Sequence, residues 1–199
     1  MPKSFPDHER AAIDRALRQA ADTSLRRSGV RGTTVDQLVA AAGISKGAFY
    51  TFYRSREALL WEVVKEEERR LIDAIVAIAS GPGPIEDRLR AAFQEHLLAV
   101  DGLASLLTEE NLALLTRKLP PEVLATDSEA GTQTLAELLR AFSLDDSAES
   151  ISLLHAMVQT LRFVASGAAS GDARITGRIL ASLTDAFVSE LLTDRQAAQ

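Results

Sequence analysis

Apolar residues recur three and four positions apart along most of this chain, which is the spacing of residues on one face of an α-helix. The alternation of apolar, β-branched residues with polar ones that marks strands is missing from the sequence. We therefore expect an all-α protein. The predicted helices cover residues 7–27, 34–42, 45–53, 55–79, 84–100, 103–119, 121–142, 146–166 and 173–193.

Residues 32–56 have the pattern of two short helices joined by a tight turn. Thr34 is followed three residues later by Gln37, a capping-box spacing in which each side chain satisfies a backbone donor at the start of a helix. Gly43 provides the left-handed residue that ends this helix, because glycine lacks a Cβ, and Ser45 can cap the next one. This arrangement is a helix-turn-helix, whose second helix is shaped to enter the major groove of DNA.

Breaks elsewhere in the pattern divide the rest of the chain into the helices of a bundle. The run SGPGP at residues 80–84 combines glycine and proline, both of which interrupt helices. Asp146 and Glu149 have the spacing of a second capping box. We also expect an irregular stretch of helix at residues 127–131 and a frayed end at residues 194–199.

Charge is distributed unevenly along the chain, although the net charge of −6 is moderate. Residues 1–56 contain ten Lys or Arg and five Asp or Glu, a net charge of +5, so the remainder carries −11. This asymmetry indicates that only the N-terminal part meets phosphate groups. The chain has no cysteine, which excludes disulfides, thiolate catalysis and cysteine-based zinc sites. Without a signal-peptide core or an apolar run of membrane-spanning length, we expect a cytoplasmic protein with no membrane partner.

The run GISKGAFYTFYRSREALL resembles the signature of the TetR family of transcriptional regulators. In that family, a turn of the type G-[VI]-S-x-G-x-[LF]-Y-x-x-[FY] precedes a basic residue, Glu-Ala-Leu and a long helix. The upstream run RALRQAADTSLRRSGVRGTTVDQL is similar to the family as well, so the resemblance covers residues 7–67. Phe52 departs from it, because many members carry histidine or tyrosine there. The resemblance implies a homodimer that binds double-stranded DNA at a palindromic operator.

The start of the second helix of the motif carries small or cationic residues that can approach phosphates and base edges closely. Lys46 is the best candidate for a contact with guanine, whereas Arg56 and the threonines are expected to contact phosphates. The same pattern also fits a solvated helical hairpin, and the family resemblance favours the DNA-binding interpretation. The predicted DNA-binding residues are Thr33, Thr34, Ser45, Lys46, Gly47, Ala48, Tyr50, Thr51, Tyr53 and Arg56.

The later helices contain apolar and aromatic residues of the kind that line enclosed pockets, with polar side chains among them. Each of these residues is also an ordinary candidate for core or surface packing. His96 and His155 have no carboxylate or second histidine three or four residues away, so we expect no metal site and no cofactor. The predicted effector pocket comprises Trp61, Phe93, His96, Met157, Gln159, Arg162 and Phe163.

The last two predicted helices are joined by a short turn and are rich in small residues, so two copies of the chain could form a four-helix bundle. The alternative is that both helices pack only within their own chain. The resemblance favours the dimer, because TetR proteins dimerise through their final helices. The predicted interface residues are Ala165, Ala168, Leu183, Phe187 and Leu191.

Together these expectations predict two domains. Residues 7–56 form a three-helix DNA-binding domain with the helix-turn-helix at 33–52, and residues 57–199 form a helical bundle for ligand binding and dimerisation. The predicted function is a transcriptional repressor, not an enzyme. As the resemblance implies, a small apolar or amphipathic effector would tilt the helix at residues 55–79 and release the operator. Two alternatives stay open: a helical-bundle ligand carrier or enzyme with an incidental helix-turn-helix, and a DNA-binding dimer controlled by a protein partner.

Overall fold

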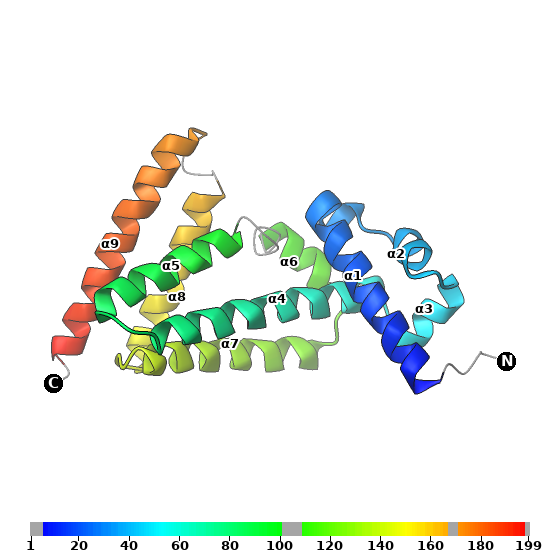
Figure 1. Cartoon of the computed structure of the whole chain (residues 1–199), viewed down its shortest axis with the longest axis horizontal. Helices are drawn as coiled ribbons and strands as arrows, with labels where there is room; N and C mark the ends of the chain where they lie inside the picture. Colours follow the sequence, from blue (N-terminus) through cyan, green and yellow to red (C-terminus); the bar gives the residue numbers. More distant parts are fainter. Residues whose placement is uncertain (1–5, 101–108, 167–170, 198–199) are drawn as a thin grey trace. The chain divides into compact units, whose positions relative to one another are not determined.

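The structure of the chain is a computed structural model, and it describes residues 6–100, 109–166 and 171–197. All regular structure in these residues is helical, so the all-α prediction is confirmed (Figure 1). The helices are α1 (Asp7–Gly32), α2 (Val35–Ala42), α3 (Lys46–Phe52), α4 (Arg56–Ala79), α5 (Ile85–Val100), α6 (Glu109–Thr116), α7 (Pro121–Ala141), α8 (Ala148–Ala165) and α9 (Ala173–Ala197).

The chain packs into two compact units. The first unit takes residues 1–68 and 102–124, and the second takes residues 69–101 and 125–199. Helices α4 and α7 therefore each contribute residues to both units. The boundary after residue 56 stays a prediction about function, because in terms of packing the start of α4 belongs with α1, α2 and α3.

The helix ends around the turn follow the sequence signals. Thr34 caps α2: its hydroxyl accepts a hydrogen bond from the Gln37 backbone N–H at 3.3 Å, and Gln37 Oε1 accepts one from the Thr34 N–H at 2.9 Å. Gly43 ends the helix in the left-handed region, with φ 69° and ψ 28°. The Ser45 hydroxyl then accepts from the Ala48 N–H at 3.1 Å and caps α3. The predicted helix-turn-helix is confirmed.

Helix α1 is interrupted by a kink at Gly29, which has φ 66° and ψ −176°. Residues with a Cβ are very rarely found in this conformation. The regular part of α1 therefore ends close to the predicted residue 27, and a further turn continues to Gly32.

The predicted start of α8 is wrong. Its N-cap is Ser147, whose hydroxyl accepts a hydrogen bond from the Ser150 N–H at 3.3 Å. The capping box expected from the spacing of Asp146 and Glu149 therefore does not form. A serine one position later supplies the same kind of acceptor, and the local sequence alone did not distinguish the two caps.

Two further expectations about helix continuity are also wrong. α7 runs without interruption through residues 127–131, and α9 continues to Ala197 instead of fraying at residue 194. The segment Asp127 to Gly131 is rich in polar residues that favour turns. Packing of Leu138 and Leu139 into the second unit compensates for this weak local preference.

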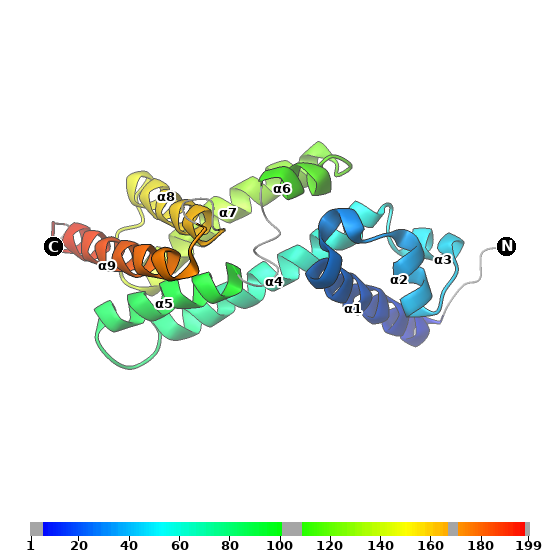
Figure 2. The ribbon, with the colours of Figure 1, turned by 90° about the horizontal axis from the view of Figure 1, so that it is seen from above.

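The first unit has its apolar core directly beneath the helix-turn-helix. Leu17 and Leu25 of α1, Leu38 of α2, Phe49 of α3 and Leu59 of α4 are fully buried in one cluster. Figure 2 shows α1, α2 and α3 gathered in this unit from a second direction. Helices as short as α2 and α3 are marginal in water on their own, so burial in this core is what keeps them folded.

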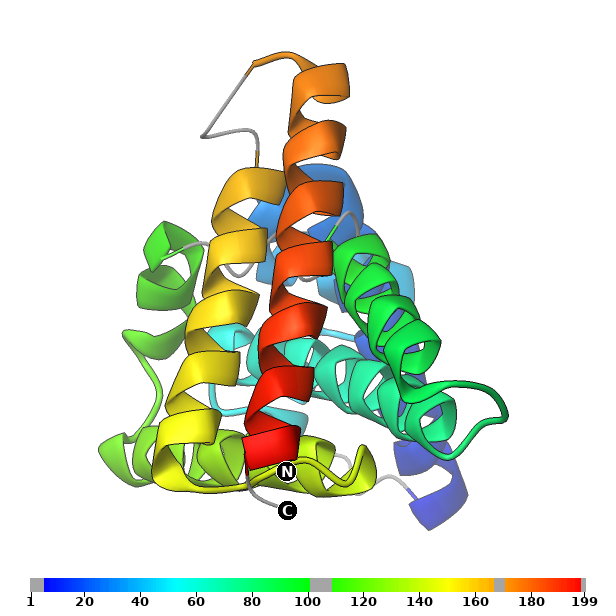
Figure 3. The same ribbon diagram turned by 90° about the vertical axis from the view of Figure 1, so that its left-hand side faces the viewer.

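The second unit is a bundle in which α5, α8 and α9 pack against one another. Figure 3 shows α8 and α9 side by side and running in opposite directions. Met157 and Leu161 of α8 and Val188 of α9 are buried in the cluster that also contains Phe93 of α5. The ring of Phe93 lies 6.2 Å from that of Phe187, so α5 and α9 are joined by an aromatic contact.

Candidate nucleic-acid interface

One face of α3 is buried and the opposite face is open to solvent. Phe49 and Tyr53 lie in the core, whereas Tyr50 is 53% exposed and Lys46 and Thr51 are also exposed. Positions four residues apart share one face of a helix, so burial of residues 49 and 53 turns residues 46 and 50 outward. The outer face therefore presents an ammonium group and hydroxyl groups.

The predicted DNA-binding residues divide by exposure. Ala48 and Arg56 are half-buried, and Thr33 and Tyr53 are buried. The exposed members of the set are Thr34, Ser45, Lys46, Gly47, Tyr50 and Thr51. These six lie along the N-termini of α2 and α3 and the outer face of α3, which is the part of a helix-turn-helix that approaches DNA.

Thr33 has an internal role that the sequence did not reveal. It is fully buried, and its hydroxyl lies 2.9 Å from the Gly29 carbonyl, to which it donates, and 3.0 Å from the Ser24 hydroxyl. These bonds fasten the kink in α1 to the start of α2. We therefore remove Thr33 from the set of residues proposed to touch DNA.

Tyr53 also points inward, where it belongs to a polar network between helices. Its hydroxyl donates to the Asp14 carboxylate of α1, and Arg18 donates to the same carboxylate at 2.9 Å. Arg18 also pairs with Glu62 of α4. Burial first, and then the hydrogen bond with Asp14, raise the pKa of Tyr53 well above its ordinary value, so the phenol stays protonated. Tyr53 holds the end of α3 to α1 and is likewise removed from the proposed DNA contacts.

Arg56 is largely engaged inside the unit. Its guanidinium donates to the Thr33 carbonyl and, at 3.0 and 3.2 Å, to Oε1 of the neighbouring Glu57. Burial acts to raise the pKa of Glu57, but a hydrogen bond from its own backbone and the positive charges of Arg56 and Lys118 outweigh burial and lower it. Arg56 thus joins the start of α4 to the start of α2.

Lys46 has an acidic neighbour that the sequence analysis missed. Its Nζ lies 3.0 Å from Oδ1 of Asp36 on α2, and both side chains are exposed. An exposed ion pair of this kind adds little stability. It does limit the directions in which the ammonium group points, so Asp36 orients the side chain that is the best candidate for base contact.

Arg10 is a second residue that the sequence analysis did not select. Its guanidinium carbon lies 4.8 Å from the centre of the Phe52 ring, within the range of a cation–π contact. Phe52 thereby brings a cation of α1 to the end of α3. The two residues are 42 positions apart in the sequence, so no local pattern could have linked them.

The predicted effector-pocket residues are not gathered in one place. Trp61 packs against the core of the first unit, whereas Phe93 and Met157 lie in the core of the second. Gln159 is exposed and Phe163 is 60% exposed. The two members left as candidates for a polar contact with a ligand are His96 and Arg162, and both belong to the second unit.

His96 is unusual because its Nε2 atom is buried and has no hydrogen-bond partner among the described residues. Burial, and to a smaller degree the positive charge of Arg162, lowers the pKa of His96 from 6.5 to about 4. The imidazole is therefore neutral at pH 7. A buried polar atom without a partner costs about 1–3 kcal/mol, so this position calls for an explanation.

The predicted dimer-interface residues are mostly turned inward. Leu191 is buried in the core of its own unit, and Leu183 and Phe187 are half-buried against that core. Ala165 is half-buried, and Ala168 lies outside the described residues. The outward face of α8 instead carries Ser152, Ala156, Gln159, Thr160 and Phe163. Leu191 is therefore a core residue, and the surface available to a second copy is formed by other positions.

Two searches of residues 6–100, 109–166 and 171–197 found no candidates. These ranges contain no group of three or more His, Asp or Glu side chains positioned to hold a metal ion. None of their helices combines the length and the apolar character that crossing a membrane requires.

Comparison with protein families agrees with this geometry. Residues 17–63 match the family model described as bacterial regulatory proteins of the tetR family. The matched segment contains most of α1, all of α2 and α3, and the start of α4. No curated protein sequence matches the chain.

Solved structures share the fold over nearly the whole chain. A TetR-like transcriptional regulator from Rhodococcus is 22% identical with a TM-score of 0.55, covering 91% of this chain and 96% of that one. A TetR-family regulator from Cytophaga hutchinsonii is 14% identical with a TM-score of 0.62, covering 95% and 98%. A fatty acid degradation regulator from Bacillus halodurans is 20% identical with a TM-score of 0.58, covering 94% and 97%.

The different positions of Tyr53 and Tyr50 generate a paired prediction. We expect Tyr53→Phe to lower the free energy of unfolding by about 1–2 kcal/mol, because it removes a buried hydrogen bond to a carboxylate. Tyr50→Phe should leave stability unchanged, because its hydroxyl faces solvent, and should weaken DNA binding. Urea unfolding and DNA-binding titrations of both variants check this. If Tyr53→Phe kept full stability and lost DNA affinity instead, our assignment of an internal role to Tyr53 would be wrong.

Proposed function

This chain is a TetR-family transcriptional regulator, and from that premise we propose that it is a homodimeric repressor that a small-molecule effector releases from a palindromic operator. We propose that it works in the cytoplasm and has no enzymatic activity. The exposed outer face of α3 is the single observation that carries the proposal, because it presents Lys46, Tyr50 and Thr51 above a tightly packed support.

Division of labour on this surface follows from the chemistry of the side chains. Lys46 lies in the first turn of α3, where a side chain can reach base edges in the major groove, and its ammonium group suits the acceptors of guanine. The hydroxyls of Thr34, Tyr50 and Thr51 suit phosphate oxygens, which position the protein without specifying sequence. Neutralised phosphates release counterions, so affinity should fall steeply with added salt.

The outward faces of α8 and α9 are suited to a second copy of the chain. Phe163 is the most exposed apolar residue of α8, and small residues such as Ala156, Gly177 and Ala181 lie on the same outward surfaces of the two helices. Small side chains let helices approach closely, as the shallow crossing of a four-helix bundle requires. We therefore propose that α8 and α9 of two copies pack together through these outward faces, and we move Phe163 from the effector pocket to the interface.

The unpartnered nitrogen of His96 supports binding of an effector within the second unit. A neutral imidazole near a guanidinium suits a polar or anionic head group, which could accept from Arg162 and complete the hydrogen bonding of His96. Apolar side chains such as Phe93 and Met157, in the core of the same unit, suit the rest of an amphipathic molecule. One structure that shares the fold is described as a fatty acid degradation regulator, so a fatty acid is a reasonable first probe.

Loss of the Lys46 side chain should affect sequence preference more than general affinity. We expect Lys46→Ala to lower discrimination at one base pair of each half-site by about 1–3 kcal/mol. Arg69→Ala, which removes an exposed cation from the part of α4 in the second unit, is the matched control and should leave discrimination intact. Fluorescence anisotropy with an operator selected from random DNA, and with its single-base variants, measures both. Unchanged discrimination in Lys46→Ala would refute the assigned base contact.

A charge on the outward face of α8 should prevent dimer formation. We expect Phe163→Glu to be a folded monomer, because the dimer would bury an unpaired carboxylate at a cost of several kcal/mol. Val76→Glu changes a 38% exposed apolar residue of α4 in the same way and should remain dimeric. Sedimentation velocity with circular dichroism distinguishes these states. A folded, dimeric Phe163→Glu would place the interface elsewhere.

The effector proposal predicts that an acidic amphiphile stabilises the protein. We expect dodecanoate to raise the midpoint of thermal unfolding, by about 2–4 °C for each kcal/mol of binding free energy, and to weaken operator binding. His96→Phe and Arg162→Gln should lose both effects, and His155→Phe, which changes an exposed histidine, should retain them. If dodecanoate has no effect and native mass spectrometry finds no co-purified small molecule, control by a protein partner becomes the better hypothesis.

A further inference from the structure

An open cleft with a volume of about 550 Å³ lies in the first unit beside α3. Three segments form it: residues of α2 and α3, the start of α4, and the residues that follow α6. Among its lining side chains are three cations and one carboxylate, so the cleft carries an excess of positive charge. The lining residues are Val35, Tyr50, Arg54, Ser55, Arg56, Glu57 and Lys118.

The carboxylate in the cleft is already neutralised from within. Glu57 is buried, and its Oε1 accepts two hydrogen bonds from Arg56, at 3.0 and 3.2 Å. Arg56 also donates to the Thr33 carbonyl. This pair therefore forms the floor of the cleft, and its two charges offset each other.

Lys118 is held much less firmly than Arg56. Its Nζ lies 3.4 Å from each oxygen of Glu57, longer than the 2.7–2.9 Å that is usual for a charge-assisted hydrogen bond. Its side chain is 62% exposed, whereas that of Glu57 is 6% exposed. The ammonium group thus lies at the opening of the cleft, where it can reach a further anion.

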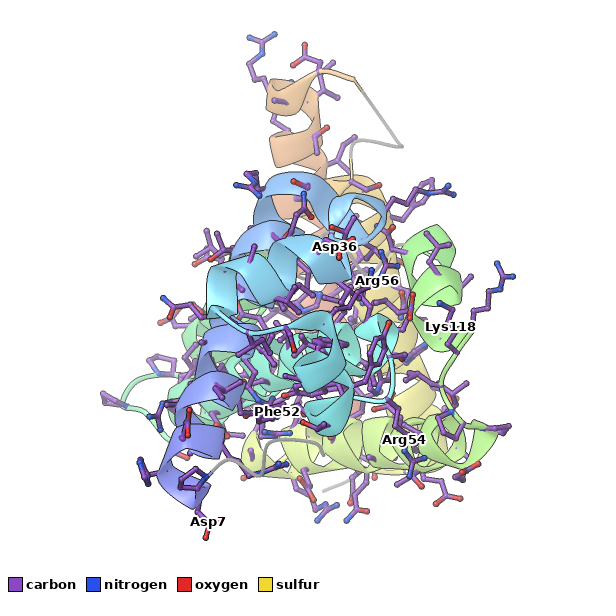
Figure 4. All side chains as sticks on the ribbon, turned by 90° about the vertical axis from the view of Figure 1, so that its right-hand side faces the viewer. Asp7, Asp36, Phe52, Arg54, Arg56 and Lys118 are labelled. Atoms are coloured by element: carbon purple, nitrogen blue, oxygen red, sulfur yellow. The ribbon has the colours of Figure 1, made fainter. Side chains whose placement is uncertain are left out.

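Arg54 is the third cation and lies just beyond the end of α3. It is exposed, and among residues 6–100, 109–166 and 171–197 no hydrogen bond or ion pair engages it. Figure 4 shows Arg54, Arg56 and Lys118 on the same side of the unit, with Asp7 on the other. Together with the exposed hydroxyl of Tyr50, Arg54 and Lys118 provide donors from three different segments.

We propose that this cleft receives a backbone phosphate of the operator, and that Lys118 is a DNA contact supplied from outside the helix-turn-helix domain. The inference rests on the proposed function. When α3 lies in the major groove, the sugar–phosphate backbone that borders the groove passes the end of the helix, where Tyr50 and Arg54 lie. Lys118 then reaches the same backbone from the segment after α6, far beyond residues 17–63 that match the family model.

The salt dependence of operator binding tests this contact. Removing one phosphate contact lowers the slope of log K against log salt concentration by about 0.9, so Lys118→Ala should lower it by about 1.8 for a dimer. Between 50 and 200 mM salt, the wild-type protein should therefore lose about 12-fold more affinity than the variant. Lys118→Arg should keep the wild-type slope. Arg117→Ala, which removes the neighbouring exposed cation that does not line the cleft, should keep it as well.

Each alternative result overturns the inference in a recognisable way. If Lys118→Ala weakened binding equally at every salt concentration, its role would be to support Glu57 and not to contact DNA. If Arg117→Ala lowered the slope as much, the effect would be one of general charge. If Lys118→Ala unfolded, Lys118→Arg with a reduced slope would still contradict the contact. A wild-type protein that bound no DNA would instead refute the proposed function itself.

Discussion

Burial of Phe49 is the interaction on which the DNA-binding surface depends. A seven-residue helix such as α3 is not stable in water by itself, so its position comes from the core beneath it. The Phe49 ring is fully buried, 6.0 Å from the Tyr53 ring and 5.3 Å, edge-on, from the Tyr50 ring. The orientation of Tyr50 on the outer face is thus supported by an aromatic contact from within.

Internal carboxylates determine which cations of the first unit are available for DNA. Asp14 accepts from Arg18 and Tyr53, and Glu57 accepts from Arg56. The net charge of +5 in residues 1–56 therefore overstates the specific contacts this part can make, because several of its cations are committed to holding helices together. Long-range attraction for phosphate depends on the whole charge, whereas close contacts depend on the exposed cations such as Lys46 and Arg54.

The second unit shows the opposite arrangement of polar and apolar groups. Its large apolar residues, including Leu191 and Met157, are buried, and the outward faces of α8 and α9 carry mainly small and polar residues with Phe163 among them. Such a surface is compatible with water and with close helix packing. His96 is the exception in the interior, because its buried nitrogen lacks a partner among the described residues. An association surface and a ligand-binding group are therefore proposed on opposite sides of the same helices.

Local rules were sufficient to predict the helix-turn-helix from the sequence. The Thr34–Gln37 capping box, the left-handed Gly43 and the Ser45 cap all depend on atoms within a few residues of one another. The same rules identified the outward residues Lys46 and Tyr50, since helical periodicity relates them to the apolar Phe49. The all-helical class followed from that periodicity as well.

Tertiary structure decided which polar residues face inward and which distant residues meet. Thr33 and Tyr53 have the composition of surface residues, and only the packing of α1 against α2 and α3 shows that their hydroxyls are enclosed. Trp61 was assigned to an effector pocket, but α4 places it against the first core. Lys118 and Glu57 are 61 positions apart. Spacing rules extend over about one helical turn, whereas such contacts depend on how whole helices pack, so the sequence determined the local geometry of the turn and the tertiary structure decided its surroundings.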